Sequence, residues 1–136
     1  MIKVLISADS KYPVDRKRIR KLVQEFLKEQ GVRAGVGVGV AIVGDRKMKV
    51  LNEQYMKHEG TTDVLSFPEV GPALVKGPLE SSGFVEPTEI GDHLGDLVVS
   101  WPQAMKQAME RNIMVDDEVD FLIRHGLLHL LGVHHD

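Results

Sequence analysis

Apolar side chains recur along this chain with two different spacings, which predict an ordered series of strands and helices. Alternation of apolar and polar positions predicts strands, whereas apolar positions three and four residues apart predict the buried face of a helix. Proline, glycine and capping side chains mark the ends of such segments. The pattern predicts strands over 2–8, 35–43, 64–69 and 94–100 and helices over 13–30, 45–55, 101–112 and 116–131.

Particular residues are expected at the ends of these segments. Pro13 is typical of the first turn of a helix, and Asp45 and Ser100 are predicted N-caps. Gly132 is expected to end the last helix in the left-handed conformation. Residues 70–92 show no periodicity, which predicts a long loop, and long loops in compact domains are usually functional.

The order of the segments predicts one domain over residues 1–136. It runs strand, helix, strand, helix, strand, strand, helix, helix, with no internal repeat or linker. The predicted fold class is α+β, a four-stranded mixed sheet packed with helices, with the apolar last helix central. The stretch 35–43 alternates glycine and valine, but its Gly-x-Gly-x-Gly spacing does not match a phosphate-binding loop. We expect its glycines to let another element approach closely.

Composition narrows the class of protein. The chain is 43% hydrophobic and 27% charged, as in soluble globular proteins. It has no cysteine, which excludes disulfides and thiolate metal sites and fits a reducing cytoplasm. The first residues lack the features of a signal peptide, and no apolar run approaches the roughly 18 residues of a membrane span. We therefore expect no membrane association.

Charge is unevenly distributed along the chain. The segment from Lys11 to Arg33 holds eight basic and three acidic residues, although the formal net charge of the chain is −3. A basic patch can attract a polyanion. The simpler interpretation is the solvated face of a helix.

Four of the six histidines lie in the last twelve residues, HGLLHLLGVHHD. His125 and His129 are four residues apart, so one face of a helix carries both rings. Gly132 then allows the chain to turn, which brings His135 within reach of the same point. Three neutral imidazoles with a fourth position open are the arrangement of catalytic zinc. The spacing predicts one zinc ion on a zincin-like metal helix, with His134 as a supporting group, a base or an exposed side chain.

The spacing His-x3-His-x5-His with a glycine at the turn is also that of the metzincin proteases. Those proteases carry a glutamate directly after the first histidine, where this chain has Gly126. Without that carboxylate a peptidase lacks the group that takes the proton from the metal-bound water. A terminal histidine pair is also typical of a purification tag, but a tag does not explain His125 and His129. The pattern therefore predicts the same metal scaffold with a different reaction.

The chain ending resembles the signature of the YbeY-type endoribonucleases, His-Gly-x-Leu-His-Leu-x-Gly-Tyr-Asp-His. LNEQYMKHEGTTDVLSFP (51–68) and HLGDLVVS (93–100) resemble two further motifs of that family, in the same order. The resemblance covers about residues 45–136 by motif and the whole chain by order of elements.

The resemblance implies a bacterial cytoplasmic enzyme that matures ribosomal RNA. It implies one zinc ion held by His125, His129 and His135, and hydrolysis of single-stranded RNA. It also implies the ribosome as a partner and a role in ribosome quality control. The expected activity is that of a zinc-dependent, single-strand-specific endoribonuclease.

This chain departs from the family pattern near its predicted site. An arginine implicated in activity usually follows the tyrosine of the middle motif, and here Met56 follows Tyr55. The family's Tyr-Asp before the third histidine is Val133-His134. Many relatives continue in a further segment, so we expect His135, near the end of this sequence, to be the least firmly held ligand.

Six side chains are candidates for catalysis or substrate binding. The catalytic candidates are Lys57, Asp63 and His134, and the substrate-binding candidates are Ser66, Arg124 and Arg18. Strand 64–69 is expected at a sheet edge because Pro68 cannot donate to a ladder, so Asp63 and Ser66 would border the cleft or else cap a turn. Asp96 is expected to orient a histidine or cap a turn.

Two other classes of function remain open. A metallohydrolase acting on peptides or small amides would need a substitute base, for which His134 is the nearby candidate. A non-catalytic ribosome-binding module with a structural zinc would fit Met56 at the arginine position. The nature of the metal is also open, since three imidazoles suit zinc, copper, nickel or iron.

Overall fold

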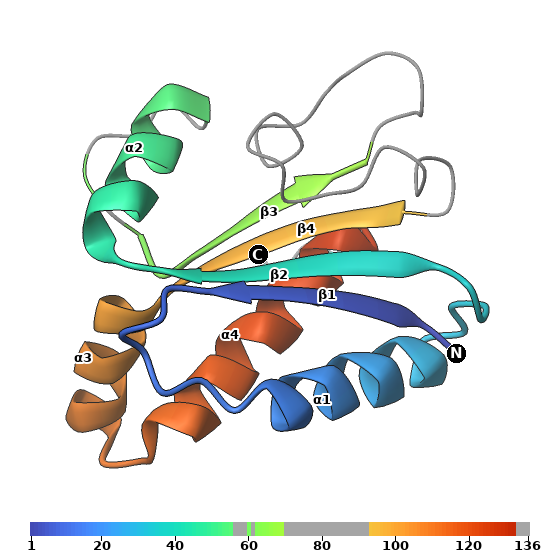
Figure 1. The fold of residues 1–136 in the computed structure, drawn as a ribbon, viewed down its shortest axis with the longest axis horizontal. Coiled ribbons are helices and arrows are strands. Elements are labelled where there is room, and N and C mark those ends of the chain that lie inside the picture. Colours follow the sequence, from blue (N-terminus) through green and yellow to red (C-terminus); the bar gives the residue numbers. More distant parts are fainter. Residues whose placement is uncertain (56–59, 61, 70–92, 133–136) are drawn as a thin grey trace.

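A computed structural model describes residues 1–55, 60, 62–69 and 93–132, and it is an α+β fold around one four-stranded sheet (Figure 1). The strands are β1 (Lys3–Ala8), β2 (Gly37–Val43), β3 (Val64–Pro68) and β4 (His93–Ser100). The helices are α1 (Arg16–Glu29), α2 (Asp45–Tyr55), α3 (Trp101–Arg111) and α4 (Val115–Leu130). Each predicted element is present, and the predicted fold class is confirmed.

The sheet is mixed, with the strand order β1-β2-β4-β3. β1, β2 and β4 run parallel, and β3 runs antiparallel to β4. α1 links β1 to β2, since parallel neighbours need a crossover connection. β3 lies at an edge of the sheet, as Pro68 predicted.

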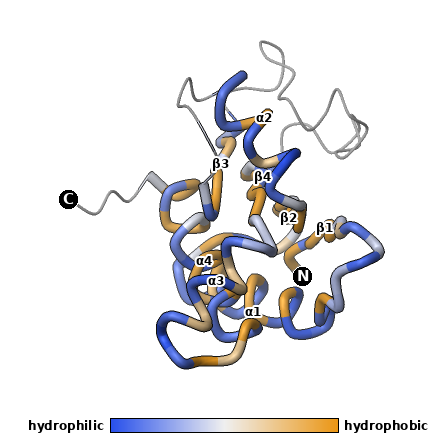
Figure 2. The backbone as a smooth tube through the Cα atoms, turned by 90° about the vertical axis from the view of Figure 1, so that its left-hand side faces the viewer, coloured by the Kyte–Doolittle hydropathy of each residue, from blue (hydrophilic) through white to orange (hydrophobic). Residues whose placement is uncertain are grey.

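The helices divide between the two faces of the sheet (Figures 1 and 2). α1 and α4 cover one face, where Val38, Val40 and Ile42 of β2 join the larger core cluster. α2 covers part of the other face with a smaller cluster that includes Ala41 and Val43. The alternating side chains of β2 therefore supply both cores, because successive residues of a strand point to opposite faces.

α4 is the central helix, as its apolar sequence predicted. Seven of its residues are buried, namely Glu118, Val119, Leu122, Ile123, Gly126, Leu127 and Leu130. It contacts β3, β4, α1 and α3. Its acidic first turn, Asp116 to Glu118, lies where the helix dipole favours negative charge. None of the helices in the described part of the chain is long and apolar enough to cross a bilayer.

Two predicted helix ends are corrected by the structure. α1 begins at Arg16 and not at Pro13, because the carboxylate of Asp15 accepts a hydrogen bond from Arg18 N and caps the helix. Asp45 is the first residue of α2 and not a residue before it. Its Oδ1 accepts from Ser100 Oγ at 2.9 Å and from Gln103 Nε2 at 3.1 Å, so this carboxylate ties α2 to α3.

Two other predicted ends are confirmed. Ser100 is the N-cap of α3, and its side chain accepts from Gln103 N. Gly132 follows α4 with a φ of +82° and donates its N–H to His129 O. A residue with a side chain is strained in that left-handed region, so the chain turns away from the helix axis at this glycine. The predicted loop 70–92 lies outside the described residues.

Candidate active site

The last two turns of α4 carry His125 and His129 on one side of the helix. Their ring centroids are 4.6 Å apart and the ring planes are inclined by 41°. Both residues are partly buried. The four-residue spacing therefore places two imidazoles side by side on a helix that is itself anchored in the core.

A cleft of about 440 Å³ opens beside these two histidines. Its lining comes from α2, from the residues before β3, from β3 and from α4: Asn52, Thr62, Asp63, Val64, Leu65, Ser66, His125 and His129. The structure thus brings the predicted residues Asp63 and Ser66 together with two of the three predicted metal ligands. A concave site with a few convergent polar groups is the usual form of an active site.

Gly126 permits the close contact between α4 and the sheet beneath this cleft. A Cβ added there would lie 2.7 Å from Leu97 Cδ2 and 3.4 Å from Ser66 Oγ. Ser66 Oγ donates a hydrogen bond to Gly126 O at 3.2 Å. At the position that holds a glutamate in metzincins, α4 therefore lies close to Leu97 of the sheet, and any side chain there would require Leu97 to shift.

Asp63 holds the start of β3 in place. Its Oδ1 accepts from Val64 N at 2.8 Å and, more weakly, from Thr62 Oγ1 at 3.5 Å. Its Oδ2 accepts from Gln107 Nε2 of α3 at 3.0 Å. Both oxygens accept hydrogen bonds, and the same side chain also lines the cleft.

The end of α2 is joined to the cleft rim by a pair of hydrogen bonds at Gly60. Asn52 Nδ2 donates to Gly60 O at 3.0 Å, and Gly60 N donates to Glu53 Oε2 at 3.0 Å. Gly60 has a φ of +83°, a conformation that favours glycine. Asn52 is 5% exposed and lines the cleft, and only its place in the 51–68 motif could have singled it out in the sequence.

Arg18 does not line the cleft. Its guanidinium donates to Asp120 Oδ2 at 2.8 and 3.0 Å and to Asp117 Oδ1 at 2.9 Å. Hydrogen bonding to Asp120, and then to Asp117, raises the pKa of Arg18 above its ordinary value. The residue thus links α1 to the first half of α4. Most other basic residues of 11–33 are exposed, as in a solvated helix face.

Other predicted residues have separate places. Arg124 is exposed on α4 but does not line the cleft. Lys57, His134 and the third predicted ligand, His135, lie outside the described residues. Asp96 pairs with a histidine as expected, but the partner is His93, at 3.0 Å.

The His93–Asp96 pair depends on an irregularity that the sequence does not reveal. The pairing of β2 with β4 shifts between Gly37 and Val38, whose partners are His93 and Gly95. Residues three apart on a regular strand point to opposite faces, and the shift puts this pair on the same face. Gly37 leaves room for the ring, since a Cβ there would lie 3.4 Å from His93 Nδ1.

The donor set of the cleft suits a metal that prefers nitrogen. Imidazole nitrogens are donors of the kind that zinc binds, and the helix holds the ring centroids of His125 and His129 4.6 Å apart. Within residues 1–55, 60, 62–69 and 93–132, no three histidine, cysteine, aspartate or glutamate side chains are grouped closely enough to hold a metal ion. The two imidazoles would supply two of the three predicted zinc ligands, and the third, His135, lies outside the described residues.

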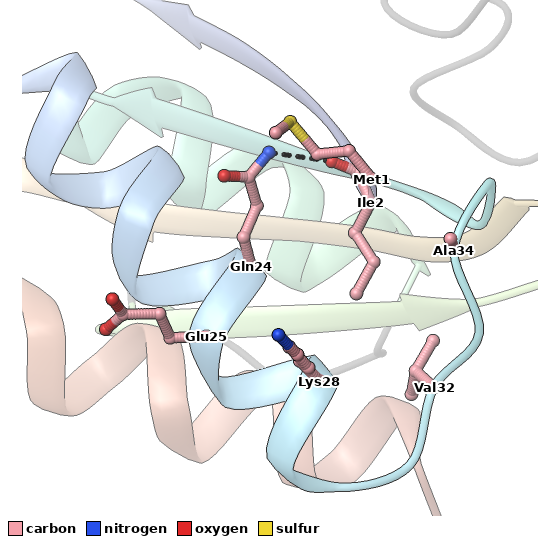
Figure 3. A pocket seen from close by; sticks show the side chains of 7 residues that line it. All are labelled: Met1, Ile2, Gln24, Glu25, Lys28, Val32 and Ala34. Carbon is pink, nitrogen blue, oxygen red and sulfur yellow. Dashed lines mark hydrogen bonds between the residues drawn. The ribbon is translucent and has the colours of Figure 1, made fainter.

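A second cavity, of about 400 Å³, lies between α1 and the start of β1 (Figure 3). It is lined by Met1, Ile2, Gln24, Glu25, Lys28, Val32 and Ala34. Gln24 Nε2 donates to Ile2 O at 2.8 Å across it. Its lining contains no histidine, so the cleft at α4 is the better candidate for catalysis.

Comparison with known proteins shows which family the chain matches. The family described as Endoribonuclease YbeY matches residues 5–136. A relative named Endoribonuclease YbeY from Dehalococcoides mccartyi is 35% identical over 136 residues, which span 98% of this chain and 83% of that protein. One of the same name from Thermus thermophilus is 36% identical over 118 residues, 87% of this chain and 75% of that protein.

A solved structure supports the fold. The solution structure of TM1509 from Thermotoga maritima aligns with a TM-score of 0.59 at 24% identity, covering 100% of this chain and 75% of that one.

Proposed function

Since this chain belongs to the endoribonuclease YbeY family, we propose that its cleft hydrolyses single-stranded RNA with a zinc ion held by His125, His129 and His135. The observation that carries the proposal is the pair of imidazoles 4.6 Å apart on α4, which lines the cleft together with β3. The family resemblance found in the sequence is confirmed. Membership makes the chain a hydrolase that acts on RNA.

Zinc, when bound, supplies a Lewis acid that activates water near neutral pH and polarises a phosphoryl oxygen. The chain's own part is to hold two imidazoles on α4 and to border them with β3, whose outer edge pairs with no strand in the described part of the chain. Ser100 N donates to Asp63 O, and Glu69 N donates to Leu94 O. In an antiparallel pair these bonds alternate, so the N–H of Ser66 points away from β4. That N–H is a donor for a phosphate oxygen of the substrate.

The group that accepts a proton during hydrolysis is proposed to lie outside the described carboxylates of the cleft. Gly126 supplies none, and both oxygens of Asp63 accept other hydrogen bonds. Lys57 and His134 remain the candidates for proton transfer or for contact with the phosphate. We assign Asp63 to positioning and Ser66 to substrate binding.

The proposed substrate is ribosomal RNA in the cytoplasm, with roles in ribosome maturation and quality control. This finer assignment rests on family membership and on the position of β3 at the edge of the described sheet, beside the cleft. Exposed Arg124 would contribute a phosphate contact near the cleft.

The test is His129→Ala, assayed for bound metal and for cleavage of a single-stranded RNA. We expect zinc in the parent protein, and loss of both zinc and cleavage in the variant. Met109→Ala, at a residue that is 79% exposed on α3, is the matched control and should behave as the parent. Unchanged cleavage by His129→Ala would refute the zinc-hydrolase proposal.

The same preparation separates the two alternatives. Cleavage of peptides that a chelator abolishes, without cleavage of RNA, would favour the peptide hydrolase. Binding of RNA without products, together with a sharp fall in melting temperature on chelation, would favour a binding module with structural zinc. The absence of a carboxylate at Gly126 argues against the peptide hydrolase, and a Cβ there would meet Leu97 Cδ2 at 2.7 Å, so a glutamate would require Leu97 to shift.

A further inference from the structure

A row of planar side chains extends from the cleft along the surface of α4. Phe121, His125 and His129 follow one another at four-residue intervals. The Phe121 and His125 ring centroids are 6.4 Å apart, and those of His125 and His129 are 4.6 Å apart. The Phe121 ring is therefore the next flat group beside the proposed metal ligands.

Phe121 is unusual for a residue of the central helix. It is 48% exposed, whereas its neighbours Leu122 and Ile123 are at most 2% exposed. The face that it presents to water is not needed for the core. Single-stranded RNA is commonly bound by stacking its bases on exposed aromatic rings, and such stacking tolerates any base.

A cation is fixed beside this ring. The guanidinium carbon of Arg111 lies 4.9 Å from the Phe121 ring centroid. Arg111 Nη1 donates to Glu118 Oε1 at 2.9 Å, and Glu118 is 1% exposed while the Arg111 side chain is 51% exposed. The buried carboxylate therefore holds the arginine over the ring, and the arginine keeps an exposed side.

Arginines flank the ring, and most of the nearby acids are paired. Exposed Arg124 lies three residues after Phe121, on a neighbouring position of the helix surface. The acids of the preceding turns are engaged with arginines: Asp117 and Asp120 with Arg18, and Glu118 with Arg111. Two guanidinium groups thus face three carboxylates and partly offset their negative charge.

We infer that Phe121 is a stacking subsite for a base of single-stranded RNA, flanked by Arg111 and Arg124 as contacts for its phosphates. This inference rests on the proposed function. It adds a binding place for a second nucleotide, beside the nucleotide that would be cleaved at His125 and His129. A strand bound in this way would run along α4 from the cleft toward the first half of the helix.

The test is equilibrium binding of a fluorescent 2′-O-methyl single-stranded oligonucleotide to the full chain, so that binding is measured in place of cleavage. Phe121→Ala and Phe121→Leu should each weaken binding by about 5- to 10-fold, because both remove the ring on which a base stacks. Leucine keeps an apolar side chain, so an equal loss in the two variants would assign the effect to stacking. Phe121→Trp should bind within about twofold of the parent. Met109→Ala, an exposed apolar residue of α3, is the control and should not change affinity.

A second arm identifies the base that stacks. Abasic nucleotides are introduced one at a time along the oligonucleotide. One position should weaken binding to the parent and have no further effect on Phe121→Ala, since the two changes remove the same contact. Circular dichroism of each variant establishes that it is folded.

Each outcome bears on one proposal. If Phe121→Ala or Phe121→Leu binds with parental affinity while the parent cleaves RNA, the subsite is refuted and the endoribonuclease proposal stands. The exposed ring would then be available to a protein partner. If the parent neither binds nor cleaves single-stranded RNA, the proposed function itself fails.

Discussion

Replacing Gly126 tests whether packing or chemistry keeps a glycine after the first ligand histidine. A Cβ at this position would lie 2.7 Å from Leu97 Cδ2 and 3.3 Å from Leu97 Cδ1. The Leu97 side chain is fully buried and cannot move toward solvent. Gly126→Ala adds one methyl to this contact, and Gly126→Glu restores the protease glutamate.

Two opposing contributions set the change in the free energy of unfolding of these variants. Alanine is about 1 kcal/mol more favourable than glycine inside a helix, and an extra methyl in a close-packed core costs about 1–3 kcal/mol. We expect Gly126→Ala to lower the free energy of unfolding by about 0–2 kcal/mol. Gly126→Glu adds a carboxylate out of reach of water, which costs several kcal/mol more, so we expect a loss of at least about 3 kcal/mol and no peptidase activity. A domain is typically stable by about 5–15 kcal/mol.

Urea unfolding followed by circular dichroism measures these losses of stability. Repeating the substitution in a Leu97→Ala protein isolates the contribution of the contact between residue 126 and Leu97. In Leu97→Ala the opposing methyls are absent, so Gly126→Ala should become neutral or stabilising by up to about 1 kcal/mol. Gly132→Ala is the matched control, because its added Cβ would meet nothing within 4 Å. Its cost, which arises from the φ of +82°, should be the same in both backgrounds.

Two results would refute this reasoning. One is a Gly126→Glu variant as stable as the parent. The other is a Gly126→Ala effect that does not change when Leu97 is truncated.

Three further changes have defined outcomes. Arg18→Ala leaves Asp120, whose side chain is 15% exposed, without its cation. The free energy of unfolding in urea should fall by about 1–2 kcal/mol, which is less than for a fully buried pair because the Arg18 side chain is 38% exposed. Because hydrogen bonding to Asp120 raises the pKa of Arg18, the guanidinium is charged throughout the range from about pH 6 to pH 9, and the loss of stability should not vary over it. A loss within error of zero would contradict the role of the pair. Asp63→Asn keeps an acceptor for Val64 N and should change cleavage by only a few-fold with an unaltered pH profile, whereas removal of a general base would cost about 100-fold or more. Asn112, at φ 56° after α3, should accept glycine without loss of melting temperature, while Asn112→Val should lose about 1–2 kcal/mol.

The sequence predicted the elements of the fold because each depends on local spacing. Alternation in β2 and the helical period of α4 need no knowledge of their neighbours. The ends were less predictable where a capping side chain has a tertiary partner. Asp45 was expected to cap α2, but Ser100 and Gln103 of another segment use its Oδ1.

The candidate site was predicted in part for the same reason. The four-residue spacing of His125 and His129 is local, and the edge position of β3 followed from Pro68, so their meeting with Ser66 in one cleft could be anticipated. Arg18 was chosen by charge alone, and charge does not reveal that Asp117 and Asp120 lie opposite. Phe121 was not selected, because an aromatic residue in an apolar helix gives no sign of which face meets water.

α4 both carries the histidines of the candidate site and packs in the core, which links the site to hydrogen–deuterium exchange of the backbone amides. The helix that carries His125 and His129 also buries Leu122, Ile123 and Leu127. Backbone amides in such a segment exchange with deuterium only through the largest opening of a domain, whereas frayed or peripheral segments exchange through small ones. The amides around the two histidines should therefore be among the last to exchange, and any ion that these rings hold should slow exchange throughout the core.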